Sequence, residues 1–512
     1  MDGADPLTVT PASSRPAAGP RGGRRSTGTV RSTLAPAVLV PALLVPALLV
    51  AAVLTCWAAA TGRYGGPDEP AHVVRAHAVA HGDLLGDPVP GLPPGYRAVT
   101  VPAALGTGDP ACYRHDPTAT SDCAAAQGSG SVTVATAAGT NPPLAYALVG
   151  LPVRLVGADD DPFAYRLVSV GLLALVLALV VRRARWSVPT AALAAAVVTP
   201  SAWFLWGVVN PNALEVALVA LAAAGVTTAR GRPGVADVWW TAVPLAIAVA
   251  MRPVAALWAL ALVVVCEIEW RGGLTRATRA VLWGVPAVGA ATVLAWSRWS
   301  SLVVQDDRTA RTGSRLDALR DSIGGLPRSG AELVASLGWL EYRAPWVAIV
   351  AWLVAVGLVV RTRPTVRPAS WWVLGVALVV VPVVFEVALH DRIGLIWQGR
   401  YGLPVAAAAA VLALGSGTRP AGSRACVVAS ATAATVLVAT HWTVARRAAV
   451  GTHGSWFFDG AVHSSRLLGP GTWVLVHAAL IVTCAAGCGW WCRRQAGDQT
   501  TSPIRPRSRT RR

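Results

Sequence analysis

Lysine is absent from this sequence of 512 residues, and charged side chains of any kind are scarce, at 14% of the chain. Soluble domains carry about 25% charged residues, so the composition excludes an ordinary water-soluble protein. Hydrophobic residues make up 54% of the chain, and the mean hydropathy is +0.51. A P-loop, a zinc-ligand spacing, a Gly-x-Ser-x-Gly motif and a dinucleotide-binding fingerprint are all missing, which leaves no motif for the mechanisms that they mark.

The positive charge is carried by arginine, and the net charge of +18 reflects where these arginines lie. They gather in the two tails and in short turns between apolar segments, which is the positive-inside pattern of membrane proteins. Such segments also attract anionic headgroups, so membrane lipid is a predicted partner. No basic patch is interleaved with stacking aromatic side chains, and we predict no nucleic-acid partner.

Apolar segments of bilayer length recur along the chain and predict an all-α polytopic membrane protein with about 12 transmembrane helices. The predicted spans are Thr33–Ala60, Phe163–Val181, Val188–Val208, Ala213–Thr228, Val238–Met251, Val254–Cys266, Val281–Ser301, Trp346–Val360, Trp371–Leu389, Tyr401–Leu414, Ala425–Val444 and Thr472–Trp491. The two spans within 238–266 are short, so this pair is either two spans or one broken helix.

Arginines on alternate turns predict a plasma-membrane protein with both termini in the cytoplasm. The basic tails, residues 1–32 and 493–512, are predicted to be disordered, and residues 33–492 to form the membrane domain. Three polar segments then lie on the outer side, at 61–160, 302–345 and 446–470. The first of them is the longest, and it gives the predicted fold a large first extracellular loop.

Cys112 and Cys123 are the cysteines of the predicted outer segments. Two cysteines close in sequence on an oxidising face favour a disulfide, and the alternative is a pair of free thiols. Cys484, Cys488 and Cys492 recur every fourth residue along the last apolar span. Small-residue helix packing in lipid explains that stripe better than a metal or redox site.

The segment that directly follows the first span contains Asp68, Glu69, His72 and Arg75. Pro70 at the first turn of a helix places the two carboxylates near the helix N-terminus, where the helix dipole favours anions. His72 and Arg75 are three residues apart and share one face of that helix. The carboxylates are candidate catalytic groups, and the alternative is that the Asp-Glu-Pro run is only a helix cap.

Further motifs place polar side chains at the ends of apolar spans on the predicted outer side. They are Asn141-Pro142-Pro143, Asn210-Pro211-Asn212 followed by Glu215, Arg252-Pro253, and Gln398-Gly399-Arg400-Tyr401. Arg252 is a functional candidate because it lies between apolar segments, and alternatively it is a snorkelling or internally paired side chain. Tyr401 is alternatively an interfacial anchor, and Asn210 a helix cap. The predicted topology brings these motifs to one side of the membrane, so we expect a shared site.

Taken in order, these motifs resemble the DUF2142 family of predicted bacterial membrane proteins, and the cysteine pair resembles actinobacterial members. The likeness runs from about Leu34 to Trp491. It rests on Pro67-Asp68-Glu69-Pro70-Ala71-His72 with Arg75, Asn141-Pro142-Pro143-Leu144, Asn210-Pro211-Asn212-Ala213-Leu214, Arg252-Pro253, Leu337-Gly338-Trp339-Leu340 and Gln398-Gly399-Arg400-Tyr401-Gly402-Leu403-Pro404. The family usually has Arg-Tyr-Phe-Leu-Pro in the last motif, where this chain has Gly402 and lacks the aromatic ring.

The resemblance implies an architecture similar to GT-C glycosyltransferases, which take sugars from polyprenyl-phosphate donors on the outer face of the membrane. It implies that Asp68 is the catalytic base, with Glu69 as the alternate. The substrate-binding candidates are His72, Arg75, Asn141, Asn210, Arg252, Gln398, Arg400 and Tyr401. The predicted function is therefore a membrane glycosyltransferase of cell-envelope glycan assembly, with a polyprenyl-phosphate sugar as its partner.

Other functions stay open at the level of the sequence. A transporter or flippase of lipid-linked sugars would use the same arginines without a base, and a non-catalytic envelope assembly protein would need neither. No metal site is predicted. A divalent cation is the cofactor left open. His72 would be its ligand, would orient the acceptor, or would do neither.

Overall fold

The structure, a computed structural model, describes residues 36–93, 95–109, 112–125, 127–229, 231–301, 313–361, 366–416, 423–458 and 468–501. The chain divides into two compact units, Met1–Pro41 and Ala42–Arg512, and the second unit carries the core and the site. The predicted tail at 1–32 lies outside the described residues, as does the tail beyond residue 501.

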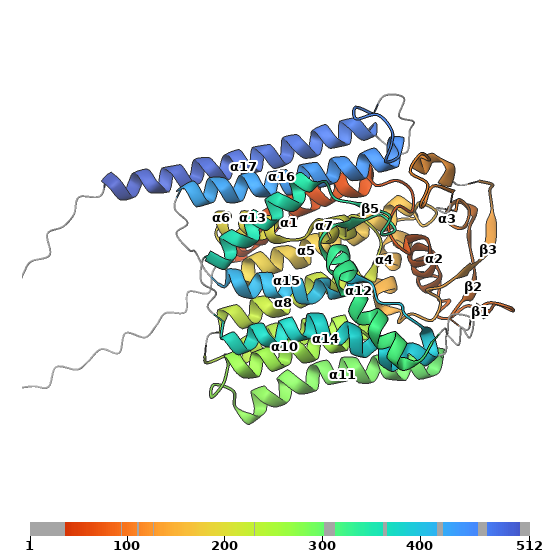
Figure 1. Ribbon diagram of the computed structural model, residues 1–512, viewed down its shortest axis with the longest axis horizontal. Helices are drawn as coiled ribbons and strands as arrows, with labels where there is room; N and C mark the ends of the chain where they lie inside the picture. The colour runs from red at the N-terminus through yellow and green to blue at the C-terminus, as the bar shows by residue number, and fades with distance from the viewer. Residues whose placement is uncertain are drawn as a thin grey trace, which may run out of the picture. The chain divides into compact units, whose positions relative to one another are not determined.

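Each predicted span is helical where it is described (Figure 1). The long helices are α1 (Pro36–Ala60), α5 (Pro162–Arg183), α8 (Pro211–Thr228), α11 (Arg276–Ser300), α14 (Pro368–Ile393), α16 (Ser423–Val450) and α17 (Pro470–Thr501). Among the described residues, these 7 helices are long and apolar enough to cross a membrane. Other predicted spans form the shorter helices α9 (Val235–Met251), α10 (Ala255–Glu269), α13 (Trp346–Arg361) and α15 (Leu403–Leu414). The chain is an all-α polytopic membrane protein.

The predicted span Val188–Val208 is not one straight helix, because the structure divides it into α6 (Val188–Val197) and α7 (Pro200–Trp206), bent by 97°. Pro200 has no backbone N–H and disfavours a helical residue before it, so α6 ends there. The Thr199 side chain then accepts a hydrogen bond from the Ala202 backbone N–H at 3.2 Å and caps α7.

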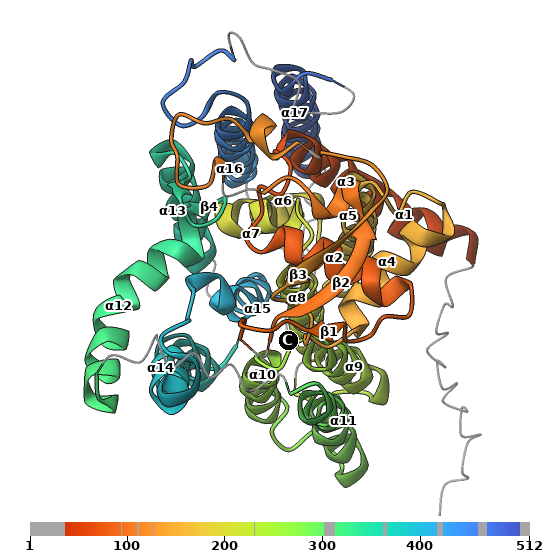
Figure 2. The same ribbon diagram turned by 90° about the vertical axis from the view of Figure 1, so that its right-hand side faces the viewer.

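The open question at 238–266 is settled as two helices. Figure 2 shows α9 and α10 as separate helices side by side. Arg252 and Pro253 lie in the short connection between them. At the C-terminal end of the chain, α17 continues to Thr501, past the predicted start of the disordered tail at residue 493. The helical boundary there lies further along the chain than hydropathy alone indicates.

Helix α8 lies at the centre of the second unit, with 89% of its residues buried. It packs against α5, α9 and α15. Alanine and glycine make up much of its sequence. Small residues let helix backbones approach closely in a membrane protein, where lipid tails are as apolar as the side chains that they replace.

The elements of the predicted first outer segment gather at one end of the helices (Figure 1). They comprise α2 (Glu69–Ala80), α3 (Ala103–Gly106), the short 3-10 helix η2 (Ser121–Ala124), α4 (Leu144–Leu155), and the antiparallel strands β1 (Asp87–Pro88), β2 (Arg97–Pro102) and β3 (Ser131–Thr136) in the order β1-β2-β3. Val99 and Val101 of β2 are buried in one cluster with Val73 and Tyr146, which attaches the sheet to α2 and α4.

The second outer segment contains a helix that the sequence analysis missed. It is α12 (Arg315–Ala335), followed by the hairpin β4 (Ser336–Leu337) and β5 (Tyr342–Arg343), and it packs against the 3-10 helix η4 (Gly399–Gly402). The Ser314 side chain accepts from the Asp317 backbone N–H, and the Asp317 carboxylate accepts from the Ser314 backbone N–H. This capping box marks the helix start in the sequence.

The predicted disulfide between Cys112 and Cys123 is confirmed, with a Cα–Cα distance of 6.1 Å. A second disulfide, which the sequence did not predict, joins Cys426 of α16 to Cys492 of α17. The Cys488 sulfur lies 3.6 Å from the Cys426 sulfur. The stripe of cysteines along α17 is therefore more than small-residue packing, because one of its members is a cross-link.

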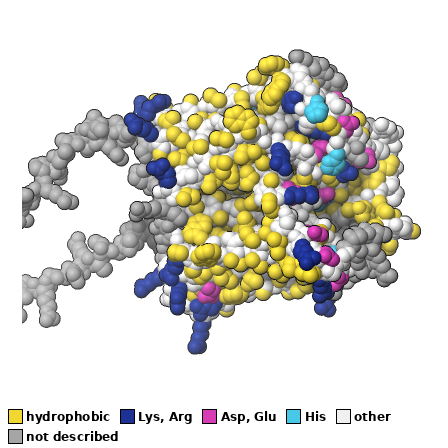
Figure 3. Space-filling model, viewed as in Figure 1, with side chains coloured by type: hydrophobic (Ala, Val, Ile, Leu, Met, Phe, Trp, Pro, Cys, Tyr) yellow, Lys and Arg dark blue, Asp and Glu magenta, His cyan; other side chains and the backbone are white. Residues whose placement is uncertain are grey.

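The surface in Figure 3 separates by polarity along the helices. Hydrophobic side chains dominate the middle of the face shown, and acidic and histidine side chains concentrate at the end that carries α2 and the sheet. The opposite end shows mainly arginine. A broad apolar band between two polar ends is what a bilayer requires of a membrane protein.

Candidate functional site

The turn before α2 brings Asp68 to the edge of the site. A Cβ atom on Gly66 would lie 2.7 Å from Val208, so this close approach requires glycine. Pro70 lies in the first turn of α2, as predicted. Asp68 precedes the helix with φ 61°, and its side chain makes no capping hydrogen bond. The alternative that Asp68 is only a cap is therefore wrong.

Asp68 instead pairs with Arg400, 332 residues further along the chain. Its Oδ2 atom lies 2.5 Å from Nη2 of Arg400. The Asp68 side chain is 49% exposed, whereas that of Arg400 is only 6% exposed. The Nε and Nη1 atoms of Arg400 are buried without a hydrogen-bond partner. One nitrogen of a buried guanidinium is thus used, and two donors remain for a ligand.

Arg400 is positioned by the contact between η4 and α12. The Gly399 backbone N–H donates to the Glu332 carboxylate at 2.8 Å, and Arg328 pairs with that carboxylate at 2.8 Å. A Cβ atom on Gly399 would lie 2.0 Å from the backbone oxygen of Ser329, so only glycine permits this approach. Gly399 therefore sets the depth at which the Arg400 side chain enters the site.

Tyr401 lies between two arginines. The guanidinium carbon of Arg252 is 5.4 Å from the Tyr401 ring centre, and that of Arg400 is 5.5 Å away. Both distances fit cation–π contacts. Arg252 also pairs with Glu215, which is fully buried and accepts a hydrogen bond from Asn212 at 3.1 Å. The alternative of an internally paired Arg252 is therefore confirmed, and the pair lies beside the Arg400 site.

His72, Arg75 and Asn141 meet around Tyr146. The Tyr146 hydroxyl is 2.9 Å from Nδ1 of His72 and accepts from the Asn141 side-chain amide at 2.9 Å. Arg75 donates to the Asn141 backbone oxygen at 3.1 Å, and its guanidinium carbon lies 5.8 Å from the Tyr146 ring centre. The predicted shared face of His72 and Arg75 is confirmed.

Arg75 is fully buried, and its Nε and Nη1 atoms have no hydrogen-bond partner. Its third nitrogen, Nη2, donates to the backbone oxygens of Leu84 at 2.5 Å and Asn141 at 3.1 Å. The Trp296 ring centre lies 6.0 Å from the guanidinium carbon. A buried charge with no carboxylate among its hydrogen-bond partners is costly in isolation, so Arg75 adds to the anion preference of this end of the protein.

Glu69 has a different environment from its neighbour Asp68. Its side chain is 1% exposed and makes two hydrogen bonds of 2.7 Å to Arg166 of α5. It also accepts from the backbone N–H groups of Gly66 and Val209, both at 3.1 Å. These contacts saturate the carboxylate and hold the turn before α2 against α5. The structure therefore contradicts the expectation that Glu69 is an alternate base.

Asn210 and Gln398 occupy supporting positions. Asn210 caps α8 by accepting from the Asn212 backbone N–H at 2.9 Å, as the alternative for it predicted, and it donates to the Pro67 backbone oxygen at 3.0 Å. The backbone oxygen of Gln398 accepts from the Tyr401 N–H at 3.0 Å. Its side-chain oxygen is buried without a partner. Asn210 therefore fixes the turn before Asp68, and Gln398 adds a buried acceptor near Arg400.

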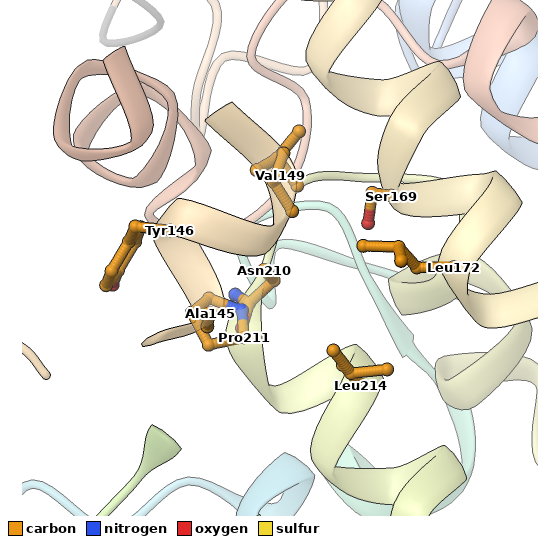
Figure 4. A pocket seen from close by; sticks show the side chains of 9 residues that line it. Ala145, Tyr146, Val149, Ser169, Leu172, Asn210, Pro211 and Leu214 are labelled. Atoms are coloured by element: carbon orange, nitrogen blue, oxygen red, sulfur yellow. The ribbon is translucent and has the colours of Figure 1, made fainter. Parts of the chain in front are cut away.

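A small cavity of about 20 Å³ lies behind Tyr146, between α4, α5 and α8 (Figure 4). Its walls are mainly apolar, with Ser169 and Asn210 among the few polar contributors. That volume holds about one water molecule. The cavity is thus too small for a sugar or a lipid, and the Asp68–Arg400 contact, with its exposed carboxylate, is the better candidate for substrate.

Electrostatics keep Asp68 ionised and His72 neutral. Burial raises the pKa of Asp68, but the positive charges of Arg400 and Arg252 lower that pKa by more, so it lies below its ordinary value of 3.8. Burial lowers the pKa of His72 to about 4. At pH 7 the site therefore offers a carboxylate that can accept a proton and a neutral imidazole that can share a hydrogen bond.

Metal-ligating side chains cluster at two places among the described residues, and neither includes Asp68 or His72. One cluster consists of Cys426, Cys488 and Cys492, and the other of His77, His81 and Asp159. The Nδ1 atom of His72 is already used by Tyr146. The structure therefore lends no support to a divalent cation held by His72.

Comparison with known proteins identifies the family. The family model described as predicted membrane protein (DUF2142) matches residues 51–409, which contain every motif from Asp68 to Arg400. The chain belongs to the DUF2142 family. Among solved structures, this DUF2142 protein has a distant likeness to ArnT from Cupriavidus metallidurans bound to undecaprenyl phosphate, with 14% identity, a TM-score of 0.42 and coverage of 91% of this chain and 80% of that one. That likeness is too distant to bear on mechanism. No curated protein matches the sequence.

Sequence reasoning about this DUF2142 chain missed Arg166, Glu332 and the role of Tyr146. Arg166 is the fifth residue of the apolar helix α5, and an arginine there is a functional or paired group by default. Applying that rule to α5, as was done for Arg252, would have found it. Nothing in the local sequence links Glu332 to Gly399, because that contact depends on how α12 packs.

Proposed function

We propose that this protein is a glycosyltransferase of the outer face of the plasma membrane, which transfers a sugar from a polyprenyl-phosphate donor to a hydroxyl of a cell-envelope glycan or lipid. One observation carries the proposal. An exposed carboxylate, Asp68, lies 2.5 Å from a buried arginine, Arg400, that keeps two further donors without partners. A base and an anion-binding group thus lie side by side at the polar end of a membrane protein.

Arg400 is assigned to the donor phosphate. The guanidinium is a planar fork of donors that matches phosphate oxygens, and a charge-assisted pair of hydrogen bonds is stronger than a neutral one. The Nε and Nη1 atoms have no partner, so each can donate to a phosphate oxygen without breaking an existing bond. A bidentate phosphate would use one of them together with Nη2, which now donates to Asp68. Arg252 also lies over the Tyr401 ring, 5.4 Å from its centre, and adds positive charge near Arg400. The buried Arg75 contributes further positive charge at this end.

Asp68 is assigned as the base, and the family resemblance gives it the same role. As the bond from sugar carbon to phosphate oxygen breaks, the acceptor hydroxyl oxygen forms a bond to that carbon and its proton passes to Asp68. The polyprenyl phosphate leaves with the electron pair and remains paired with Arg400. General base catalysis of this kind contributes about 10²–10⁴-fold to a rate. Glu69 is excluded from the role because Arg166 and two backbone N–H groups saturate it.

His72, Asn141 and Gln398 are assigned to the sugar or acceptor. His72 and Asn141 share the Tyr146 hydroxyl, and Gln398 has a buried oxygen without a partner. Neutral donors and acceptors of this kind can form hydrogen bonds with substrate hydroxyl groups without adding charge to the site. A substrate hydroxyl that donates to the Gln398 oxygen would satisfy a polar atom that is costly to leave unpaired.

The test is sugar transfer from a polyprenyl-phosphate donor by the protein in lipid vesicles. Asp68→Asn removes the proton acceptor and nearly keeps its shape, so we expect transfer to fall by about 10²–10⁴-fold while donor binding and folding persist. Asp87→Asn, at an exposed carboxylate of the same outer segment, is the matched control and should transfer normally. Full transfer by Asp68→Asn would end the assignment of the base.

A flippase of lipid-linked sugars is the second candidate, and the bend between α6 and α7 favours it, because discontinuous helices hold substrate in many transporters. A flippase needs Arg400 for the headgroup but no base. Headgroup translocation measured in the same vesicles separates the two functions. Translocation that survives Asp68→Asn and is lost in Arg400→Ala, without any sugar transfer by the native protein, would identify the flippase.

A further inference from the structure

We propose that His77, His81 and Asp159 form a binding site for a divalent transition-metal ion of the zinc type. The site is separate from Asp68 and Arg400 and would clamp the C-terminal turn of α2 to the connection between α4 and α5. Each of the three side chains offers one ligand atom, and these atoms all lie within 4.8 Å of one another. This inference is independent of the proposed glycosyltransferase function.

Two ligands come from one helix face. His77 and His81 are four residues apart at the end of α2, and this spacing places two side chains one above the other. Their imidazole rings stack with centres 4.1 Å apart. Asp159 comes from the connection between α4 and α5, and α4 packs directly against α2. The packing of α4 against α2 thus brings one carboxylate next to two imidazoles.

The hydrogen bonds of His81 show that a cation belongs between it and Asp159. Nδ1 of His81 lies 2.9 Å from the His77 backbone oxygen, which can only accept, so Nδ1 carries the hydrogen. The remaining nitrogen, Nε2, lies 3.1 Å from Oδ2 of Asp159. In the neutral imidazole both of these atoms bear lone pairs and repel. Either a second proton or a metal ion must therefore lie between them.

His77 makes the metal the better occupant. Its Nδ1 atom faces two oxygen atoms, the Asp159 backbone oxygen and the Tyr165 hydroxyl, each at 3.3 Å. Tyr165 already donates its hydrogen to that backbone oxygen at 3.1 Å, so Nδ1 of His77 is the donor. Its Nε2 atom then carries a free lone pair, so the two stacked imidazoles can share one metal ion. A backbone oxygen on the other nitrogen is the usual way to orient a metal-binding histidine.

The ligand set indicates the kind of ion. Two imidazoles and one carboxylate suit zinc and its neighbours cobalt and nickel, and hard ions such as magnesium prefer oxygen alone. The side chains of His81 and Asp159 are 35% and 30% exposed. An ion can therefore enter from the outer side, and water can complete its coordination.

A bound ion would stabilise the helix that carries the candidate site. Asp68 directly precedes α2, and His72 and Arg75 lie in the first half of that helix. The proposed ligands His77 and His81 lie at its C-terminal end. The Arg154 side chain also donates to the Ala80 backbone oxygen at 2.5 Å, which ties the same turn to α4. The ion would thus fix α2 at the end opposite to Asp68, without touching substrate.

The experiment uses the full-length protein in detergent after treatment with a chelator. Binding of Zn²⁺ is measured by calorimetry, and coordination is read from the visible absorption bands of Co²⁺. We expect one ion per chain, tetrahedral or five-coordinate Co²⁺ bands, and a thermal unfolding midpoint that rises with Zn²⁺ concentration. His77→Gln and Asp159→Asn should each weaken binding by about 100-fold or more, since loss of even a supporting partner costs 10–100-fold.

His453→Gln is the matched control, because His453 is an exposed histidine of another outer segment and belongs to neither metal-ligating cluster. That variant should bind Zn²⁺ with unchanged affinity. Two results would overturn the proposal. One is Zn²⁺ binding that survives the double variant His77→Gln with Asp159→Asn. The other is no binding by the native protein, with His81 holding its second proton at pH 7 by NMR, which would make the cluster an ordinary ion pair.

Discussion

Two adjacent carboxylates, Asp68 and Glu69, each pair with an arginine from a distant part of the chain, but the two regions differ in every other respect. The Glu69–Arg166 region is closed: the side chains are 1% and 6% exposed, and Arg166 also donates to three backbone oxygens at 2.6–2.9 Å. The Asp68–Arg400 region is open. Asp68 is 49% exposed, and two of the three nitrogens of Arg400 have no hydrogen-bond partner.

The comparison shows that the number of unsatisfied donors, more than the presence of an ion pair, distinguishes a binding site from a structural contact. A buried pair with all of its hydrogen bonds made gains nothing from a ligand. A buried guanidinium with free donors gains new hydrogen bonds when a ligand binds, and these offset the cost of leaving buried polar groups unpaired. The same chain thus uses one arginine to hold α2 in place and leaves another with free donors, which we propose to face a ligand.

The largest effect is expected from breaking the closed pair. Glu69→Gln leaves the Arg166 charge buried without its counter-ion, and removing one partner of such a pair costs about 3–5 kcal/mol. We therefore expect a large fall in the free energy of unfolding, measured by denaturant titration in detergent. Asp68→Asn is the paired control and should change stability little. Equal stability losses in the two variants would show that the regions are alike.

A smaller effect is expected from removing the open arginine. Arg400→Ala deletes a charge-assisted pair of hydrogen bonds to phosphate, and bonds of this kind contribute about 1.5–3 kcal/mol, or roughly 10–150-fold in affinity. Binding of a polyprenyl phosphate to the purified protein measures the change. Arg315→Ala is the control, because that side chain is 67% exposed on α12. Unchanged binding in Arg400→Ala would remove the phosphate site.

The smallest effect is expected from moderate acid. Because the folded-state pKa of Asp68 is below 3.8, its ionised form stabilises the folded protein above that pH, and this contribution is lost only as the pH falls through the folded value. Between pH 7 and about pH 5 the base should stay ionised, and the transfer rate should show no acid limb from Asp68. In Arg400→Ala the limb should move to higher pH. A wild-type limb near pH 6 that the variant leaves in place would contradict this assignment.

The sequence predicted which motifs meet, and it did so from topology. Arginine alternation placed Asp68, Arg252 and Arg400 at one end, and the structure brings them together around Tyr401. Apolar length located a helix in every predicted span, and among the described residues 7 of these helices are long and apolar enough to cross a membrane, because the bilayer sets a minimum length. Features that depend only on span length and on the distribution of arginines can therefore be predicted from the sequence.

The sequence could not say which of the two adjacent carboxylates is available. Neighbouring residues at a helix start point to different sides, and the partner of each is set by packing between helices far apart in sequence. Arg166 reaches Glu69 across 97 residues, and Arg400 reaches Asp68 across 332. The bend at Pro200 was readable in principle from a Thr-Pro-Ser run, but its angle of 97° depends on the surrounding helices.

The most direct test of the account is a structure of the protein in a lipid nanodisc with bound polyprenyl phosphate. We expect the phosphate beside Arg400, with an oxygen about 2.7–2.9 Å from Nε or Nη1 and with the Asp68 carboxylate facing the same space. Glu69 and Arg166 should keep their present contacts. A phosphate bound elsewhere, with Arg400 still attached to Asp68 alone, would contradict the account.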